Sequence, residues 1–140
     1  TIKNMNQFSQ LDLRKPNTGT FAEQKVRYLP LNIFRLQVLQ LVTQFCEEIS
    51  KGALNPVVCK QLKFRSMTSR WGTCSTKGVI TINTKLKNLP LQLVEFVVFH
   101  ECLHLMHMNH GVNFKKRIQK RFPNKKELEH QLKLFGLSEL

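Results

Sequence analysis

The sequence predicts an α+β fold: a long amphipathic helix, a small three-stranded and mainly antiparallel sheet, and three further helices. Three observations predict it. Apolar residues first recur at helical spacing, three short stretches of β character follow, and the chain then turns to one strongly apolar and two polar helical patterns. Because 140 residues make one ordinary domain, we expect a single domain over 29–140, preceded by an extended arm over 1–28.

The first two segments differ sharply in pattern. Residues 1–28 are polar, contain turn formers and show no sustained period, which is typical of an extended arm. After Pro30, apolar residues recur at three- and four-residue steps as far as Ile49, and Gly52 closes the segment. This pattern predicts an amphipathic helix of about five turns that ends at a glycine.

Three short stretches then have β character, at 57–65, 68–75 and 79–83. Lys77 and Gly78 form a typical tight turn between the last two stretches, which favours antiparallel pairing. We therefore expect a small sheet built mainly from antiparallel neighbours.

The last part of the chain is predicted to be helical. Pro90 suits the first turn of an apolar, mostly buried helix that ends near Asn109 or Gly111. Two more helices are expected at 113–121 and 124–135, where polar residues alternate with apolar ones at helical spacing.

Composition limits the classes of protein to consider. Hydrophobic residues make up 41% of the chain, which argues against disorder. The 22 Lys and Arg residues exceed the 9 acidic ones, and a net charge of +13 favours polyanionic or acidic partners. The four cysteines are widely spaced without a CxxC pair, as in a reduced, cytoplasmic protein. Histidines and glutamates interrupt the most apolar stretch, so we expect no membrane span.

Four of the five histidines fall within eleven residues, and His100 to His104 read HExxH. On a helix, His100 and His104 lie on one face about 6 Å apart, so both can reach one metal ion. Glu101 stands beside them, where its carboxylate can take a proton from water held on that ion. The motif also arises by chance, but burying these groups without a partner would be costly. We therefore predict one zinc ion (Zn2+) per chain.

A catalytic zinc needs a third protein ligand and an open fourth position. His107 is one candidate, but seven residues of straight helix span about 10.5 Å, too far for three histidines in line. We favour His110, because Asn109 tolerates left-handed backbone and a chain that turns there can bring His110 back to the ion. Glu127 or Glu129, on a following helix, is the other option.

Substrate contacts are harder to assign from the sequence. Arg70, Trp71, His107 and Asn109 are candidates for binding substrate or stabilising an oxyanion, and so is Tyr28 for the latter. A lone Trp beside a glycine in a strand is more often part of the core, and Arg70 could equally pair with a structural acid. For the second nitrogens of the zinc-binding histidines, backbone carbonyls are the expected acceptors.

A dense group of basic residues follows the histidines. It suits either a solvated helix face or a surface that contacts nucleic acid. The candidate nucleic-acid contacts are Lys115, Lys116, Arg117, Lys120 and Arg121.

Several motifs together resemble the YgjP-like metallopeptidase family, which is related to the SprT-like and WLM zinc proteases. They are the run Ser-Arg-Trp-Gly-Thr-Cys-Ser at 69–75, Ile-Asn at 82–83, Leu86, Pro90, HExxH at 100–104, Asn-His at 109–110, and Phe114. The resemblance implies a compact zincin-like fold, with His100, His104 and His110 as zinc ligands and Glu101 as the general base. It also implies a protein or peptide substrate, and SprT-like relatives act on proteins bound to DNA.

The sequence thus predicts a zinc metallopeptidase in which Glu101 assists water on the zinc to attack a peptide bond. Two alternatives stay open: a zinc hydrolase of a non-peptide substrate such as a nucleotide, and a non-catalytic, basic, metal-bound module that binds nucleic acid. Nothing in the sequence indicates the oligomeric state.

Overall fold

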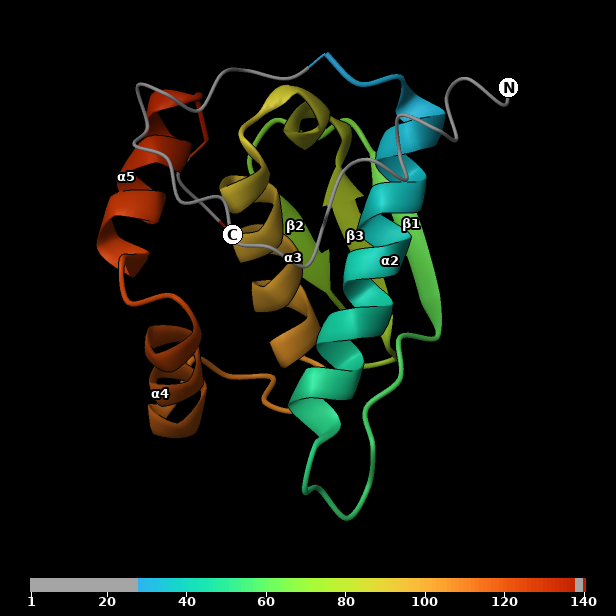
Figure 1. Cartoon of the computed structure of the whole chain (residues 1–140), viewed down its shortest axis with the longest axis vertical. Helices are drawn as coiled ribbons and strands as arrows, with labels where there is room; N and C mark the ends of the chain where they lie inside the picture. Colours follow the sequence, from blue (N-terminus) through green and yellow to red (C-terminus); the bar gives the residue numbers. More distant parts are fainter. Residues whose placement is uncertain (1–27, 138–139) are drawn as a thin grey trace.

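The computed structural model describes residues 28–137 and residue 140, and it has the α+β class that the sequence predicts (Figure 1). The arm expected over 1–28 lies outside the described residues, apart from Tyr28. The elements are α2 (Leu31–Ser50), β1 (Gln61–Arg65), β2 (Gly72–Cys74), β3 (Val79–Asn83), the 3₁₀ helix η1 (Thr84–Asn88), α3 (Leu91–Leu103), α4 (Val112–Arg121) and α5 (Lys125–Leu134). The 3₁₀ helix was not predicted.

The three strands form a mixed sheet in the order β1-β3-β2. The hairpin between β2 and β3 is antiparallel as predicted, and Gly78 adopts the left-handed φ of 81° in its turn. By contrast, β1 runs parallel to β3, from Gln61 opposite Val79 to Arg65 opposite Asn83, so the expectation of a mainly antiparallel sheet was wrong. The reason is that β3 lies between β1 and β2 in the sheet. It therefore pairs with β1 as well as with β2, and β1 and β3 point in the same direction.

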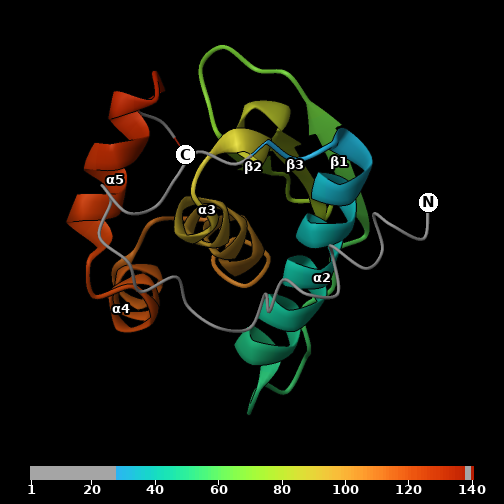
Figure 2. The ribbon, with the colours of Figure 1, turned by 45° about the horizontal axis from the view of Figure 1, so that its top comes forward.

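Helix α3 is the centre of the molecule. It contacts α2, β2, β3, η1 and α5, and Figure 2 shows it between α2 with the sheet and the pair α4 and α5. Every residue from Leu93 to Leu103 is buried, which explains why α3 is apolar all round. Edge-to-face aromatic contacts join it to its neighbours, with ring centroids 5.3 Å apart for Phe45 and Phe99 and 5.2 Å apart for Phe96 and Phe122.

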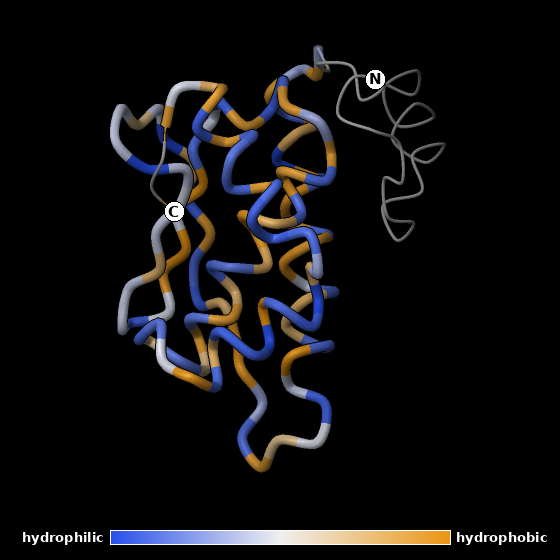
Figure 3. Tube along the Cα trace, turned by 90° about the vertical axis from the view of Figure 1, so that its left-hand side faces the viewer, coloured by the Kyte–Doolittle hydropathy of each residue, from blue (hydrophilic) through white to orange (hydrophobic). Residues whose placement is uncertain are grey.

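The outer helices bury only one stripe each. The buried residues of α4 are Phe114 and Ile118, and those of α5 include Leu128 and Leu132. Hydrophilic and hydrophobic residues accordingly alternate along the trace on this side of the molecule (Figure 3). No helix in the described part of the chain is long and apolar enough to cross a membrane.

Helix α3 ends at Leu103, six residues before the predicted end at Asn109. Tighter bonds replace the helical ladder there, from Leu105 N–H to the Cys102 carbonyl at 3.0 Å and from Met106 N–H to the Leu103 carbonyl at 3.1 Å. The expected left-handed turn at Asn109 is absent, because no described residue other than glycine has a positive φ. Beyond His104 the chain is half-buried over 105–107 and exposed over 108–113, so the turn occurs where the chain reaches the surface.

Candidate metal centre

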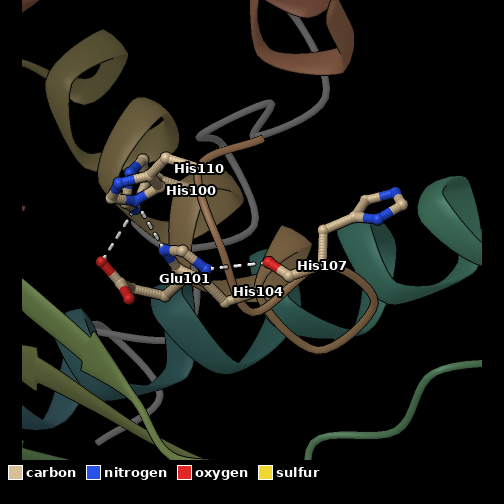
Figure 4. A network of polar contacts seen from close by, with 5 residues as sticks. All are labelled: His100, Glu101, His104, His107 and His110. Carbon is tan, nitrogen blue, oxygen red and sulfur yellow. Dashed lines mark hydrogen bonds and ion pairs between the residues drawn. The ribbon is translucent and has the colours of Figure 1, made fainter. Parts of the chain in front are cut away.

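Three histidines converge at the end of α3. His100 belongs to α3, His104 follows its last residue, and His110 lies in the connection to α4. One potential ligand atom from each histidine lies within 4.8 Å of the other two, and the Nε2 atoms of His104 and His110 are 3.0 Å apart (Figure 4). Among the described residues, no cysteine, aspartate or glutamate joins this cluster.

The ring of His104 has a defined orientation and tautomer. Its Nδ1 lies 3.0 Å from the backbone carbonyl oxygen of His107, which can only accept, so Nδ1 carries the hydrogen. The lone pair is then on Nε2, which faces His110. Burial lowers the pKa of His104 and of His110, and the nearby His100 lowers both pKa values further. A lowered pKa favours the neutral form of the ring, which is the form that binds metals.

Of the candidate third ligands, only His110 is in the cluster. The ring of His107 points away from the other three (Figure 4), and its backbone carbonyl instead orients His104. Glu127 accepts a hydrogen bond from Gln131 Nε2 at 3.0 Å, and Glu129 Oε1 lies 3.9 Å from Lys125 Nζ.

Glu101 lies against both His100 and the edge strand β2. Its side chain is 2% exposed, and Oε2 is 3.1 Å from Nδ1 of His100. On the other side is Gly72, where a Cβ atom would stand 2.9 Å from Glu101 Cγ and 3.2 Å from Oε2. A side chain at this position would therefore displace the Glu101 carboxylate from its place against β2. This role of Gly72 was not predicted from the sequence, although a glycine inside a strand can signal such a close approach.

The apolar ring of Phe114 packs against the rings of all three histidines. Its ring is stacked on His104 at 4.6 Å between centroids, and it lies 5.1 Å from the ring of His100 and 4.9 Å from that of His110. Because Phe114 is buried in α4, it couples the position of this helix to the rings on α3 and the loop. This contact of Phe114 with the histidines was not predicted from the sequence.

The loop before β2 is fixed by a buried asparagine. The side-chain amide of Asn83 donates to the carbonyls of Met67 at 2.9 Å and Arg70 at 2.8 Å. Trp71, a candidate substrate contact, is instead 1% exposed, and its indole N–H donates to the Leu137 carbonyl at 2.7 Å. Trp71 thus lies in the core, the location that the sequence analysis favours, and it is not among the described residues that line the cavity beside the histidines.

A cavity of about 540 Å³ opens beside the histidines, between α3, α4 and α5. His100 and His110 line it together with Arg70. Arg70 is exposed, and a residue that binds substrate must be accessible in this way. Asn109 lines a different and smaller hollow, together with His107. The remaining lining residues are Phe96, Phe114, Lys115, Ile118, Lys125, Glu129, Lys133 and Leu140.

Comparison with known proteins identifies the family. A model of the YgjP-like metallopeptidase domain matches residues 8–135, which is most of the sequence. The chain belongs to the YgjP-like metallopeptidase family. The match begins at residue 8, so it includes most of the segment that the sequence analysis treats as an arm. Family membership makes this YgjP-like domain a peptidase and so a hydrolase, as the resemblance implied.

Two solved structures share its fold. The metallopeptidase zymogen abylysin of Pyrococcus abyssi matches with a TM-score of 0.61 and 23% identity, over 74% of this chain and 99% of its own. The metallopeptidase zymogen jannalysin of Methanocaldococcus jannaschii matches with a TM-score of 0.54 and 18% identity, over 70% of this chain and 87% of its own. No curated protein matches the sequence.

The basic residues of α4 do not form one uniform surface on the YgjP-like domain. Arg117 donates to the Ile49 carbonyl at the end of α2 at 3.1 Å and to Met106 Sδ at 3.0 Å. Arg121 lies 3.2 Å from Glu48 Oε1, and its guanidinium is 5.0 Å from the ring centroid of Phe122. These two arginines therefore hold α4 against the core.

The three lysines of the group differ from the arginines. Lys115 lines the cavity, whereas Lys116 and Lys120 are simply exposed. Of the five predicted nucleic-acid contacts, only these lysines have no structural contact that would occupy them in the described part of the chain.

Proposed function

We propose that this YgjP-like domain is a zinc-dependent peptidase in which His100, His104 and His110 hold one zinc ion and Glu101 is the general base. The observation that carries the proposal is the convergence of three imidazoles beside a buried carboxylate, at the mouth of a cavity. Three protein ligands leave the fourth position that a catalytic zinc keeps open.

The residues fit such an ion. Tetrahedral zinc with bonds of about 2.0–2.1 Å to nitrogen places its ligand atoms roughly 3.3 Å from one another. The 3.0 Å between the Nε2 atoms of His104 and His110 is within a few tenths of that separation. Neutral imidazoles are the ligands that zinc binds, and the lowered pKa values of these two histidines favour that form.

Zinc bound there would supply a Lewis acid that lowers the pKa of water and polarises the scissile carbonyl. Glu101 would accept the proton as the water oxygen bonds to the carbonyl carbon, and would pass it to the amine when the C–N bond breaks. Its burial keeps bulk water away from the carboxylate, and Gly72 leaves it room beside His100. Arg70, exposed in the same cavity, is our candidate for binding the substrate.

Replacing the proposed base tests this assignment. Glu101→Gln should keep its metal, because Glu101 is not a ligand, and should lose about 10²–10⁴-fold in kcat. Glu127→Gln is the matched control, since Glu127 contacts Gln131 outside the site. Peptide hydrolysis at the wild-type rate by zinc-loaded Glu101→Gln would refute the role of the glutamate.

The same assay separates the peptidase from its alternatives. Casein, short peptides and nucleoside triphosphates would be offered side by side to the zinc-loaded protein. Release of peptides alone supports the proposal, whereas release of phosphate or base would favour a nucleotide hydrolase. Nucleic-acid binding, if present, would depend on Lys116 and Lys120 and would weaken steeply with salt.

We also propose that residues 29–140 form one domain that works in the cytoplasm. The four cysteines, all free, suit a reducing compartment, and α3 packs against elements from both halves of the chain. Folding of a fragment that begins at residue 29, judged by cooperative thermal unfolding, tests the domain boundary.

A further inference from the structure

The cavity beside the histidines is unusually rich in positive charge. Four cationic side chains line it, from three separate parts of the chain: Arg70 before β2, Lys115 on α4, and Lys125 and Lys133 on α5. Among the lining residues that the structure describes, Glu129 is the one with an anionic side chain. We propose that this cavity selects peptides that carry a carboxylate close to the scissile bond, a specificity that rests on the proposed peptidase function.

Lys115 and Lys133 are the described lining residues on which the positive charge of the cavity rests. Glu129 Oε1 is 3.9 Å from Lys125 Nζ, so this carboxylate is associated with a different lysine. Lys115 and Lys133 have exposed side chains, and they come from α4 and α5, two of the helices that line the cavity. A cleft lined by one sign of charge concentrates ligands of the opposite sign, and its walls strengthen each interaction relative to open water. The cavity therefore favours an anionic ligand beyond the effect of the overall charge of +13.

The position of these charges relates them to the reaction centre. His100 and His110 line the same cavity, so a peptide whose carbonyl reaches the histidines would have its neighbouring residues among the lysines. The apolar side chains of Phe96 and Ile118 line the cavity too and can pack against the aliphatic part of a Glu or Asp residue.

A carboxylate can come from an acidic side chain or from the C-terminus of a peptide, and the test distinguishes these sources. Four fluorescent peptides would share one sequence: three amidated peptides with Glu, Gln or Lys beside the scissile bond, and the Gln peptide with a free C-terminus. Dissociation constants would be measured by anisotropy on zinc-loaded Glu101→Gln, which should not cleave them, at low and at high salt. Cleavage by the wild-type enzyme would be followed in parallel.

Two charge-reversed double variants provide the matched comparison. Lys115→Glu with Lys133→Glu alters the cavity, whereas Lys116→Glu with Lys126→Glu makes the same change in net charge on exposed parts of the same two helices. Circular dichroism would check the fold of both. The milder pair Lys115→Gln with Lys133→Gln serves if the first double variant unfolds.

At low salt, we expect the amidated Glu peptide, or the Gln peptide with a free C-terminus, to bind at least about tenfold more tightly than the amidated Lys peptide. The cavity variant should abolish that preference, the surface variant should keep it, and salt should weaken it. Equal binding of all four peptides, or an equal loss in both double variants, would overturn the proposal. So would displacement of the peptide by a short oligothymidylate at lower concentration, because the cavity would then be a nucleic-acid site.

The design separates this inference from the function on which it rests. Cleavage of the four peptides without regard to charge would overturn the specificity and leave the peptidase assignment intact. Charge-selective binding with no cleavage by the zinc-loaded wild-type enzyme would support the carboxylate site and refute the peptidase assignment.

Discussion

Gly72 provides the sharpest structural prediction, because the substitution Gly72→Ala should move the proposed base without touching a metal ligand. A Cβ at this position would stand 2.9 Å from Glu101 Cγ, whereas carbon atoms in contact are about 3.5–4.0 Å apart. The carboxylate side chain, which is almost fully buried, must then shift by about half an ångström or more. Because misplacement by about 1 Å can cost about 10²-fold in rate, we expect kcat/KM to fall about 10- to 100-fold.

Three measurements define the outcome for Gly72→Ala. Zinc content should equal that of the wild type, because Glu101 is not a proposed ligand, while overpacking should lower the free energy of unfolding by about 1–3 kcal/mol. Gly111→Ala is the control, since Gly111 has a φ of −77° and open space around its Cβ position. Wild-type kcat/KM in Gly72→Ala, or an equal loss in Gly111→Ala, would refute the argument that β2 positions the base.

Two further predictions concern stability. Arg117→Ala should lower the free energy of unfolding by about 1.5–3 kcal/mol, since the guanidinium donates to the Ile49 carbonyl at the end of α2. Urea denaturation would measure this loss. Lys116→Ala, which removes an exposed side chain on the same helix, should show no such loss. In metal-free protein, the pKa values of His104 and His110 lie below the ordinary 6.5, so stability should be full above pH 6.5 and fall as pH drops through the lowered values. Urea denaturation midpoints at pH 7.5 and pH 5 would check this. The midpoint should drop less between these two pH values when His104 and His110 are both replaced by alanine.

The helical parts of the fold could be predicted well from periodicity. The predicted helix after Pro30, the helix after Pro90 and the two C-terminal helices all appear, with starts that agree to within a residue or two. These segments carry long repeated apolar patterns. Local signals also mark their boundaries, since Pro90 precedes the start of one helix and Gly52 follows the end of another. The fully buried α3 was recognised because it is apolar on nearly every side, apart from HExxH.

Strand pairing could not be obtained in the same way. The Lys77–Gly78 turn correctly predicted the antiparallel β2–β3 hairpin, which is a local feature. The position of β1 beside β3 depends on packing between segments that are distant in sequence, and short strands carry little pattern to reveal it. The 3₁₀ helix was missed for a related reason. Asn83, which caps it by accepting from the Lys85 N–H, is itself held by the carbonyls of Met67 and Arg70, which are distant in sequence.

The sequence predicted the residues of the candidate site better than the contacts that hold those residues in place. The sequence placed His100, Glu101 and His104 on one helix and required a turn to bring back a third ligand, and His110 lies in the resulting cluster. The turn itself occurs earlier than predicted, because tight bonds after Leu103 replace the left-handed residue that was expected. Gly72 and Phe114 support the site through contacts between separate elements, which spacing along the chain does not reveal.

The central claim is that three histidines, with His110 as the third, hold one zinc ion. Elemental mass spectrometry on purified, zinc-supplied protein tests it directly, with the wild type, His110→Ala and His107→Ala measured together. The account predicts about one zinc per chain in the wild type, loss in His110→Ala, and retention in His107→Ala, which keeps the backbone carbonyl that orients His104. Tightly bound zinc in His110→Ala, or no zinc in the wild type, would contradict it.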